Sequence, residues 1–195
     1  MKTKHILLVC VILTHFCYSQ TNATQKLYNE LFKWSVTIPE GFEKISAAES
    51  DKFKNKGINA IEDTFGETVI DESETIFVFK NGPANVFEAN YQPFDTEIDG
   101  DYSESRKAVN DILYETFKTQ MPKAKITRSN STEKIDGLTF YVHTINIELP
   151  NKMVLKAMMF NRLFGKREFT VNIMFLDKIL GEQLLDAWRS STFGK

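Results

Sequence analysis

Residues 138–176 read LTFYVHTINIELPNKMVLKAMMFNRLFGKREFTVNIMFL, and this stretch decides the fold class. It contains three runs rich in β-branched and aromatic residues, separated by short breaks at Pro150–Asn151 and Gly165–Lys166. Breaks this short join antiparallel strands, because a parallel connection needs a dozen or more residues. In the last run large apolar residues alternate with polar ones, which is the pattern of a strand with one buried face. Its far end is apolar on both faces, as in a strand inside a layered sandwich.

Further strands are predicted upstream of this stretch. They are residues 34–38, 75–79, 84–91 and 124–132. Residues 134–137, which contain Asp136-Gly137, are expected to form the turn between the fourth of these and the run that starts at Leu138. The sequence therefore contains about seven strands, most of them joined by short turns.

Three helices are predicted between and after these strands. Residues 102–120 form the clearest one, because apolar residues recur there at three- and four-residue spacing, at Val109, Ile112, Leu113 and Phe117. A second helix is expected from Lys178 to about Ser190. A third opens at Ser46 with capping-box spacing and is expected to end or bend at Gly57. Residues 20–32 are polar and are expected to be at most loosely helical.

These elements predict an α+β fold: an antiparallel sheet of about six or seven strands sandwiched by about three helices. A doubly wound parallel sheet is disfavoured, because strands and helices do not alternate along the chain. The length of 195 residues, the hydrophobic fraction of 42% and the scarcity of glycine fit one domain with a core of its own.

The first 19 residues have the pattern of a secretory signal peptide. Lys2 and Lys4 precede an apolar run, and small residues stand at Cys17 and Ser19, where a signal peptidase requires them. The run is too short to span a bilayer, which takes about 20 apolar residues. A lipid anchor on Cys17 is disfavoured, because the residues before it do not fit that processing signal. We therefore expect cleavage near Ser19 and an extracytoplasmic location, periplasmic or secreted.

The predicted organisation is thus a signal peptide over residues 1–19, an N-terminal extension over 20–32 and a single α/β domain over 33–195. Both cysteines and two of the three histidines lie within the first 19 residues, so the processed chain retains only His143 from these residue types. Disulfides are then not part of its stability. The formal charge of the whole chain is −2, with no Lys/Arg stripe, which disfavours a nucleic-acid partner.

This inventory excludes several classes of enzyme. Thiol chemistry needs a cysteine, a zinc site usually needs two or more His or Cys ligands, and a serine-hydrolase triad would have to use His143 as its base. Because His143 stands in a predicted strand, on the same face as Tyr141 and Ile145, we expect it to serve packing or a single hydrogen bond. Nucleotide-binding and nucleophile-elbow motifs are absent from the sequence. We expect no catalytic residue and no cofactor.

One acidic loop is the only candidate metal site. Acidic residues alternate around Gly100 at Asp95, Glu97, Asp99 and Asp101, and the first three match the first ligand positions of an EF-hand loop. The twelfth position of that loop is Arg106, where the bidentate carboxylate should stand. The favoured interpretation is a solvated turn that leads into a helix, with calcium binding as the alternative.

Two other clusters have simpler interpretations. Acidic residues at Glu62, Asp63, Asp71, Glu72 and Glu74 could supply the paired carboxylates of a glycosidase, although acidic surface loops are commoner. Met153, Met158 and Met159 could form an adaptable binding surface, although core packing fits a strand that is apolar on both faces.

The order of the elements resembles the Mog/PsbP-like superfamily, an α/β/α sandwich. The resemblance covers residues 33–193 and rests on short motifs: IPEGF at 38–42, IDGL at 135–138 and SSTF at 190–193. Members of that superfamily are mostly non-catalytic and bind other proteins, so the resemblance implies a protein partner that the sequence leaves unidentified. No functional residue can be transferred, because no partner-binding motif matches position by position.

We therefore predict an exported, non-catalytic binding or accessory module of a bacterial-type cell envelope or secretome, acting through protein–protein contact. The alternatives are a carboxylate-based hydrolase of envelope polymers and a calcium-dependent binding protein.

Overall fold

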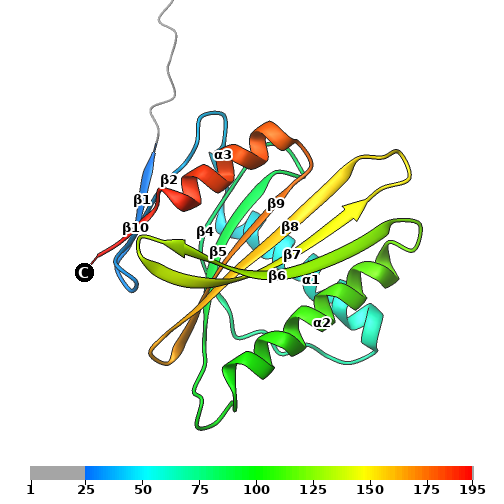
Figure 1. The fold of residues 1–195 in the computed structure, drawn as a ribbon, viewed down its shortest axis with the longest axis horizontal. Helices are drawn as coiled ribbons and strands as arrows, with labels where there is room; N and C mark the ends of the chain where they lie inside the picture. Colours follow the sequence, from blue (N-terminus) through cyan, green and yellow to red (C-terminus); the bar gives the residue numbers. More distant parts are fainter. Residues whose placement is uncertain (1–24, 195) are drawn as a thin grey trace, which may run out of the picture.

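The computed structural model describes residues 25–194, which form ten strands and three helices (Figure 1). The strands are β1 (Lys26–Asn29), β2 (Trp34–Thr37), β3 (Glu43–Lys44), β4 (Glu74–Lys80), β5 (Val86–Pro93), β6 (Lys125–Ile135), β7 (Leu138–Glu148), β8 (Val154–Phe164), β9 (Arg167–Phe175) and β10 (Thr192–Phe193). The helices are α1 (Ala47–Phe65), α2 (Tyr102–Gln120) and α3 (Lys178–Arg189). The predicted signal peptide and Cys17 lie outside the described residues.

Seven strands form one sheet in the order β3-β4-β5-β9-β8-β7-β6, and every paired strand in it is antiparallel. This confirms the predicted fold class. The hairpin between β6 and β7 turns at Asp136 and Gly137, whose φ angles are +47° and +80°. A two-residue turn with both φ angles positive matches the twist of the strands on either side of it, which is why Asp-Gly is favoured there.

A second sheet of three strands, in the order β1-β2-β10, joins the two ends of the described chain. The prediction of a loose helix before residue 33 is wrong for its described part, because residues 26–29 pair with β2. Leu27 and Phe32 are buried in the same core as the large sheet. The burial of these two side chains stabilises this arrangement over the loose helix that the polar composition suggested.

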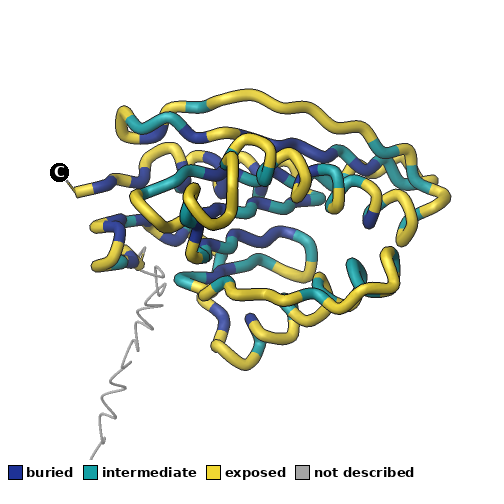
Figure 2. Tube along the Cα trace, turned by 90° about the horizontal axis from the view of Figure 1, so that it is seen from below, coloured by how far each residue is buried: buried dark blue, intermediate teal, exposed yellow. Residues whose placement is uncertain are grey.

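Helix α3 packs directly on one face of the seven-stranded sheet. Gly181 makes this close approach possible, since an added Cβ there would lie 2.2 Å from the ring of Phe175 in β9. Trp188 of α3 is fully buried against aromatic rings from both sheets, with ring centroids 5.0 Å from Phe140 and 6.1 Å from Trp34. Figure 2 shows the buried positions concentrated along the strands.

Helices α1 and α2 lie side by side on the opposite face of the sheet (Figure 1). Ser46 caps α1 by accepting a hydrogen bond from the backbone N–H of Glu49, as its spacing predicted. The helix does not end at Gly57 but continues to Phe65, so that prediction is wrong. A mid-helix glycine costs about 1 kcal/mol, which contacts with α2, such as the hydrogen bond from Gln120 to the Ala60 carbonyl, can offset. Helix α2 has the predicted bounds.

No helix in the described part of the chain is both long enough and apolar enough to cross a membrane.

Candidate ligand cleft

A cleft of 510 Å³ separates helices α1 and α2 from the sheet. Its roof is apolar and comes from the helices: Phe53, Ile58 and Ile61 of α1, and Val109, Leu113 and Phe117 of α2. Three of the four residues in the predicted apolar stripe of α2 therefore face the cleft, and Val109 remains 39% exposed. Because the strands do not cover this apolar stripe, a ligand can contact it.

The floor of the cleft comes from the sheet and combines polar side chains with apolar ones such as Val86, Ile145 and Met174. The strand register places Glu88, Asn172, Met159 and His143 in one row across β5, β9, β8 and β7. Asn90, Thr170 and Asn161 form the next row. The polar face of an antiparallel sheet usually meets water, but here Thr170, Asn161 and His143 are buried beneath the helices. The cleft is thus amphipathic, with most of its hydrogen-bonding groups in the floor and a mainly apolar roof.

Glu168 lies at one end of this floor and is held by neutral donors. Its carboxylate accepts hydrogen bonds from the Gln92 amide at 2.7 Å, the Tyr102 hydroxyl at 3.0 Å and the Asn161 amide at 3.2 Å. Burial and the charge of Glu168 raise the pKa of Tyr102, which therefore remains a donor. These contacts satisfy Glu168 and fix the strand ends, which indicates a structural role.

Glu88 has fewer partners in the same floor. Its carboxylate accepts a hydrogen bond from the Asn172 amide at 3.3 Å. The nearby ammonium of Lys54 is bound elsewhere, 2.9 Å from the Asp71 carboxylate and 2.6 Å from the Ser73 carbonyl oxygen. Burial raises the pKa of Glu88, because the charged form loses hydration that the amides of Asn172 and Asn90 do not replace.

Asp71 lines the same cleft in a different environment. Burial by itself would raise its pKa, but hydrogen bonds from Lys54 and Ser73 outweigh that effect and lower the pKa. The cleft therefore holds two carboxylates, Asp71 and Glu88, whose surroundings shift their pKa values in opposite directions.

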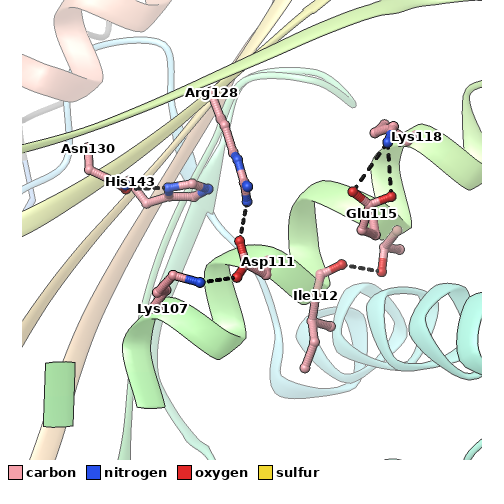
Figure 3. Close-up of polar contacts among 9 residues, drawn as sticks. Lys107, Asp111, Ile112, Glu115, Lys118, Arg128, Asn130 and His143 are labelled. Carbon is pink, nitrogen blue, oxygen red and sulfur yellow. Dashed lines mark hydrogen bonds and ion pairs between the residues drawn. The ribbon is translucent and has the colours of Figure 1, made fainter. Parts of the chain in front are cut away.

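His143 is only 3% exposed and has one unused nitrogen. Its Nδ1 lies 2.7 Å from the Oδ1 of Asn130 on β6, the single hydrogen bond that we expected for this residue. Because an amide oxygen only accepts, Nδ1 is the protonated nitrogen and Nε2 is an acceptor in the neutral ring. Nε2 is buried without a partner, and Figure 3 shows it pointing away from Asn130. Burial and the nearby charge of Arg128 lower the pKa of His143, which keeps the ring neutral.

Arg106 borders the cleft from α2. Its guanidinium lies 3.6 Å from the ring centroid of Tyr141 and 5.2 Å from that of Tyr102. Such stacking fixes the position of the cation. Arg128 on β6 is likewise tied to α2 through an ion pair with Asp111, which also binds Lys107 (Figure 3). These contacts connect the helix layer to the rim of the sheet.

The acidic loop that could bind calcium uses three of its four candidate carboxylates, all but that of Glu97, internally. Asp95 pairs with Lys166 and accepts from the backbone of Glu97, while Asp99 accepts from the backbone of Asp95. Asp101 is the N-cap of α2 and accepts from the backbone of Glu104. Within residues 25–194, no group of three or more His, Cys, Asp or Glu side chains is placed to hold a metal ion. Calcium binding stays an untested alternative from the sequence.

The other acidic cluster is dispersed. Glu62 accepts a hydrogen bond from the Val69 backbone, and Glu74 accepts one from the Tyr91 hydroxyl. Of the five carboxylates considered for acid–base chemistry, only Asp71 lines the cleft. Met158 and Met159 lie on opposite faces of β8, and Met158 belongs to the core.

Sequence reasoning missed Glu88, Glu168 and Asn172 as candidate site residues. The signal was present in the alternation of β5 and β9, where polar residues stand between the buried positions Phe87, Ala89, Phe169 and Val171. Alternation alone predicts a solvated face. In a sandwich with helices on both sides of the sheet, the same positions become the floor of a cleft.

Comparison with known proteins identifies the fold of this chain. No protein-family model matches the chain, and no curated protein sequence matches it. The cyanobacterial PsbP protein CyanoP from Synechocystis sp. PCC 6803 is similar in structure, with a TM-score of 0.56 and 8% identity over 91% of this chain and 97% of CyanoP. The Ran-binding protein Mog1p from Saccharomyces cerevisiae matches with a TM-score of 0.42 and 10% identity, over 87% of this chain and 95% of Mog1p.

The chain therefore has the Mog/PsbP-like fold, as its element order predicted.

Proposed function

We propose that this protein is an exported, non-catalytic binding module that holds a ligand in the amphipathic cleft between its sheet and helices α1 and α2. The observation that carries the proposal is the unfilled volume of 510 Å³ beneath an apolar roof. Small-molecule sites are concave and mostly apolar, with a few well-placed polar groups. The exposed apolar stripe of α2 and the amides of the floor, of which Asn161 is buried, meet this description.

The non-catalytic part of the proposal is supported by the surroundings of His143. Its Nδ1 bonds to an amide and not to a carboxylate, and its Nε2 has no hydroxyl partner. A nucleophile–base–acid arrangement needs both of these contacts. Binding is therefore a better account of this buried histidine than nucleophilic catalysis.

Export is supported by the sequence of residues 1–19. Expression of the whole chain in a bacterial host, followed by N-terminal sequencing of the processed protein, should give a chain that starts at Gln20. An unprocessed cytoplasmic protein would contradict export and leave ligand binding untouched.

A protein partner in the envelope is also part of the proposal, as the sequence predicts. Affinity capture from the envelope fraction should return the same protein in repeated experiments. Repeated capture of nothing would count against a partner.

The cleft can be tested with N-phenyl-1-naphthylamine, a neutral dye whose fluorescence rises in apolar surroundings. We expect saturable binding to one site. Gly57 of α1 lines the cleft and an added Cβ there meets nothing within 4 Å, so Gly57→Leu should place a side chain at the cleft and weaken dye binding at least tenfold. Asn59→Leu adds the same side chain at an exposed position of α1 outside the lining and serves as the matched control.

Dye binding that is absent, or that is equal in both variants, would contradict the proposed cleft function.

A second candidate is favoured by one observation. Asp71 and Glu88 line the same cleft and their pKa values are shifted in opposite directions, a pattern found in acid–base pairs. This fits a carboxylate-based hydrolase of envelope polymers. Incubation with purified peptidoglycan should give no soluble products if the protein only binds. Products that disappear in Glu88→Gln would establish the hydrolase instead.

A further inference from the structure

The charges that line the cleft do not balance. Three carboxylates face it, from Asp71, Glu88 and Glu168, against two permanent cations, Lys54 and Arg106. Lys54 pairs with Asp71, and Arg106 stacks on the rings of Tyr141 and Tyr102, with no carboxylate partner among the described residues and a buried, unpartnered Nε. Glu88 is the carboxylate left with only amide contacts. A partly buried charge of this kind is costly unless a cation pairs with it.

Two hydrogen-bonding groups of the floor also favour a ligand that carries donors. Glu88 offers carboxylate oxygens, and the buried Nε2 of His143 is an acceptor without a donor. Both groups can therefore accept hydrogen bonds from donors on a ligand. They lie in one row, three strand spacings or about 14 Å apart, with Met159 between them. Above the row stand the apolar side chains of α1 and α2.

We propose that the ligand is an organic amine with an apolar body, whose ammonium pairs with Glu88 and whose far end donates a hydrogen bond to His143. The apolar body lies along the row, between Met159 and the helix side chains. This inference rests on the proposed cleft function and specifies the chemistry of its ligand.

The inference is tested with three molecules that share an eight-carbon body and differ in the head group: octylamine, 1-octanol and octanoate. Isothermal titration calorimetry at neutral pH should show octylamine binding at least tenfold more tightly than 1-octanol, with octanoate the weakest. Glu88→Gln keeps the shape and the contact with Asn172 but removes the charge, and should reduce octylamine affinity at least tenfold. Glu182→Gln, at an exposed position of α3, makes the same change away from the cleft and should have no effect.

The far end is tested with 8-amino-1-octanol, which adds a hydroxyl donor to octylamine. It should bind several-fold more tightly than octylamine to the wild-type protein. His143→Phe, checked for an unchanged circular dichroism spectrum, should remove that gain and leave octylamine affinity unaltered. If this variant does not fold, binding of 8-amino-1-octanol at pH values that protonate the imidazole should lose the same gain.

Failure of this inference is distinguishable from failure of the cleft. Equal or tighter binding of 1-octanol or octanoate, or no effect of Glu88→Gln, would overturn the amine while dye binding stands. Binding of none of the three molecules by a protein that binds the dye would overturn it as well. Loss of dye binding itself would overturn the proposed function.

Discussion

On the α3 face of the seven-stranded sheet, aromatic rings from both sheets close around Trp188, and an added Cβ at Gly181 would lie 2.2 Å from Phe175. On the opposite face, α1 and α2 stand over a 510 Å³ cleft, and an added Cβ at Gly57 meets nothing within 4 Å. The same strands serve both faces, with large apolar residues toward α3 and a mixture of polar and apolar residues toward the cleft. The α3 face can thus supply stability while the other face stays free to bind.

The largest expected difference between the faces is the cost of truncating an aromatic side chain. Trp188→Ala should lower the free energy of unfolding by about 3–5 kcal/mol, because it empties the centre of a close-packed cluster. Phe117→Ala on the cleft roof should cost about 1–2 kcal/mol, because its ring already faces open space. Urea unfolding of both variants measures the two values. Equal costs would mean that the roof is packed as tightly as the core.

The effect of a glycine-to-alanine substitution on stability should have opposite signs on the two faces. Gly181→Ala should destabilise the protein by about 1–3 kcal/mol, because the new methyl group overlaps the Phe175 ring. Gly57→Ala should stabilise it by up to about 1 kcal/mol, since alanine is the better helix former and has room there. Thermal unfolding, followed by circular dichroism, measures the stability change of both variants. A destabilising Gly57→Ala would show that the cleft is filled at that position.

The charge in the cleft floor should appear as a pH-dependent stability. Burial raises the pKa of Glu88 above the value of 4.5 for an exposed glutamate. Its contribution to stability is therefore complete below the unfolded pKa and is lost as the pH rises through the raised folded value. Glu88→Gln removes that loss, so it should stabilise the protein by about 1 kcal/mol at pH 8, with the gain shrinking toward pH 4.

Melting temperatures of wild type and variant across this pH range measure the effect. A gain that is independent of pH, or a loss of stability at pH 8, would contradict a costly charge at Glu88.

The smallest expected effect is that of calcium on the loop at residues 95–101. Asp95 already forms an ion pair with Lys166, and Asp101 already accepts a hydrogen bond from the backbone of Glu104. Millimolar Ca²⁺ should therefore leave the melting temperature unchanged, because only a ligand bound by the folded state raises it. A rise of several degrees that Asp99→Asn removes would support the calcium-dependent alternative.

Much of the architecture could be predicted because local signals and tertiary packing agree. The bounds of α2 follow from its apolar spacing, and the β6–β7 hairpin from Asp136-Gly137. Prediction failed where tertiary contacts outweigh local preference: Leu27 and Phe32 draw a polar segment into the second sheet, and α1 continues through Gly57 beside α2.

The candidate site was harder to predict than the fold. The acidic loop at residues 95–101 stood out because its carboxylates are close in sequence. Glu88 and His143 stand in the same row of the sheet only because of the strand order β5-β9-β8-β7, which no local pattern encodes. The depth of the cleft depends on how far α1 and α2 stand from the sheet, and that distance is set by packing between elements.

The claim that one face binds and the other stabilises is tested most directly by mapping octylamine onto the protein with backbone amide NMR spectra. We predict dose-dependent shifts in β5, β9, α1 and α2, centred on Glu88, and no shifts around Trp188 in α3. Shifts that cluster on α3, or spectra unchanged at saturating amine, would contradict the division of the two faces.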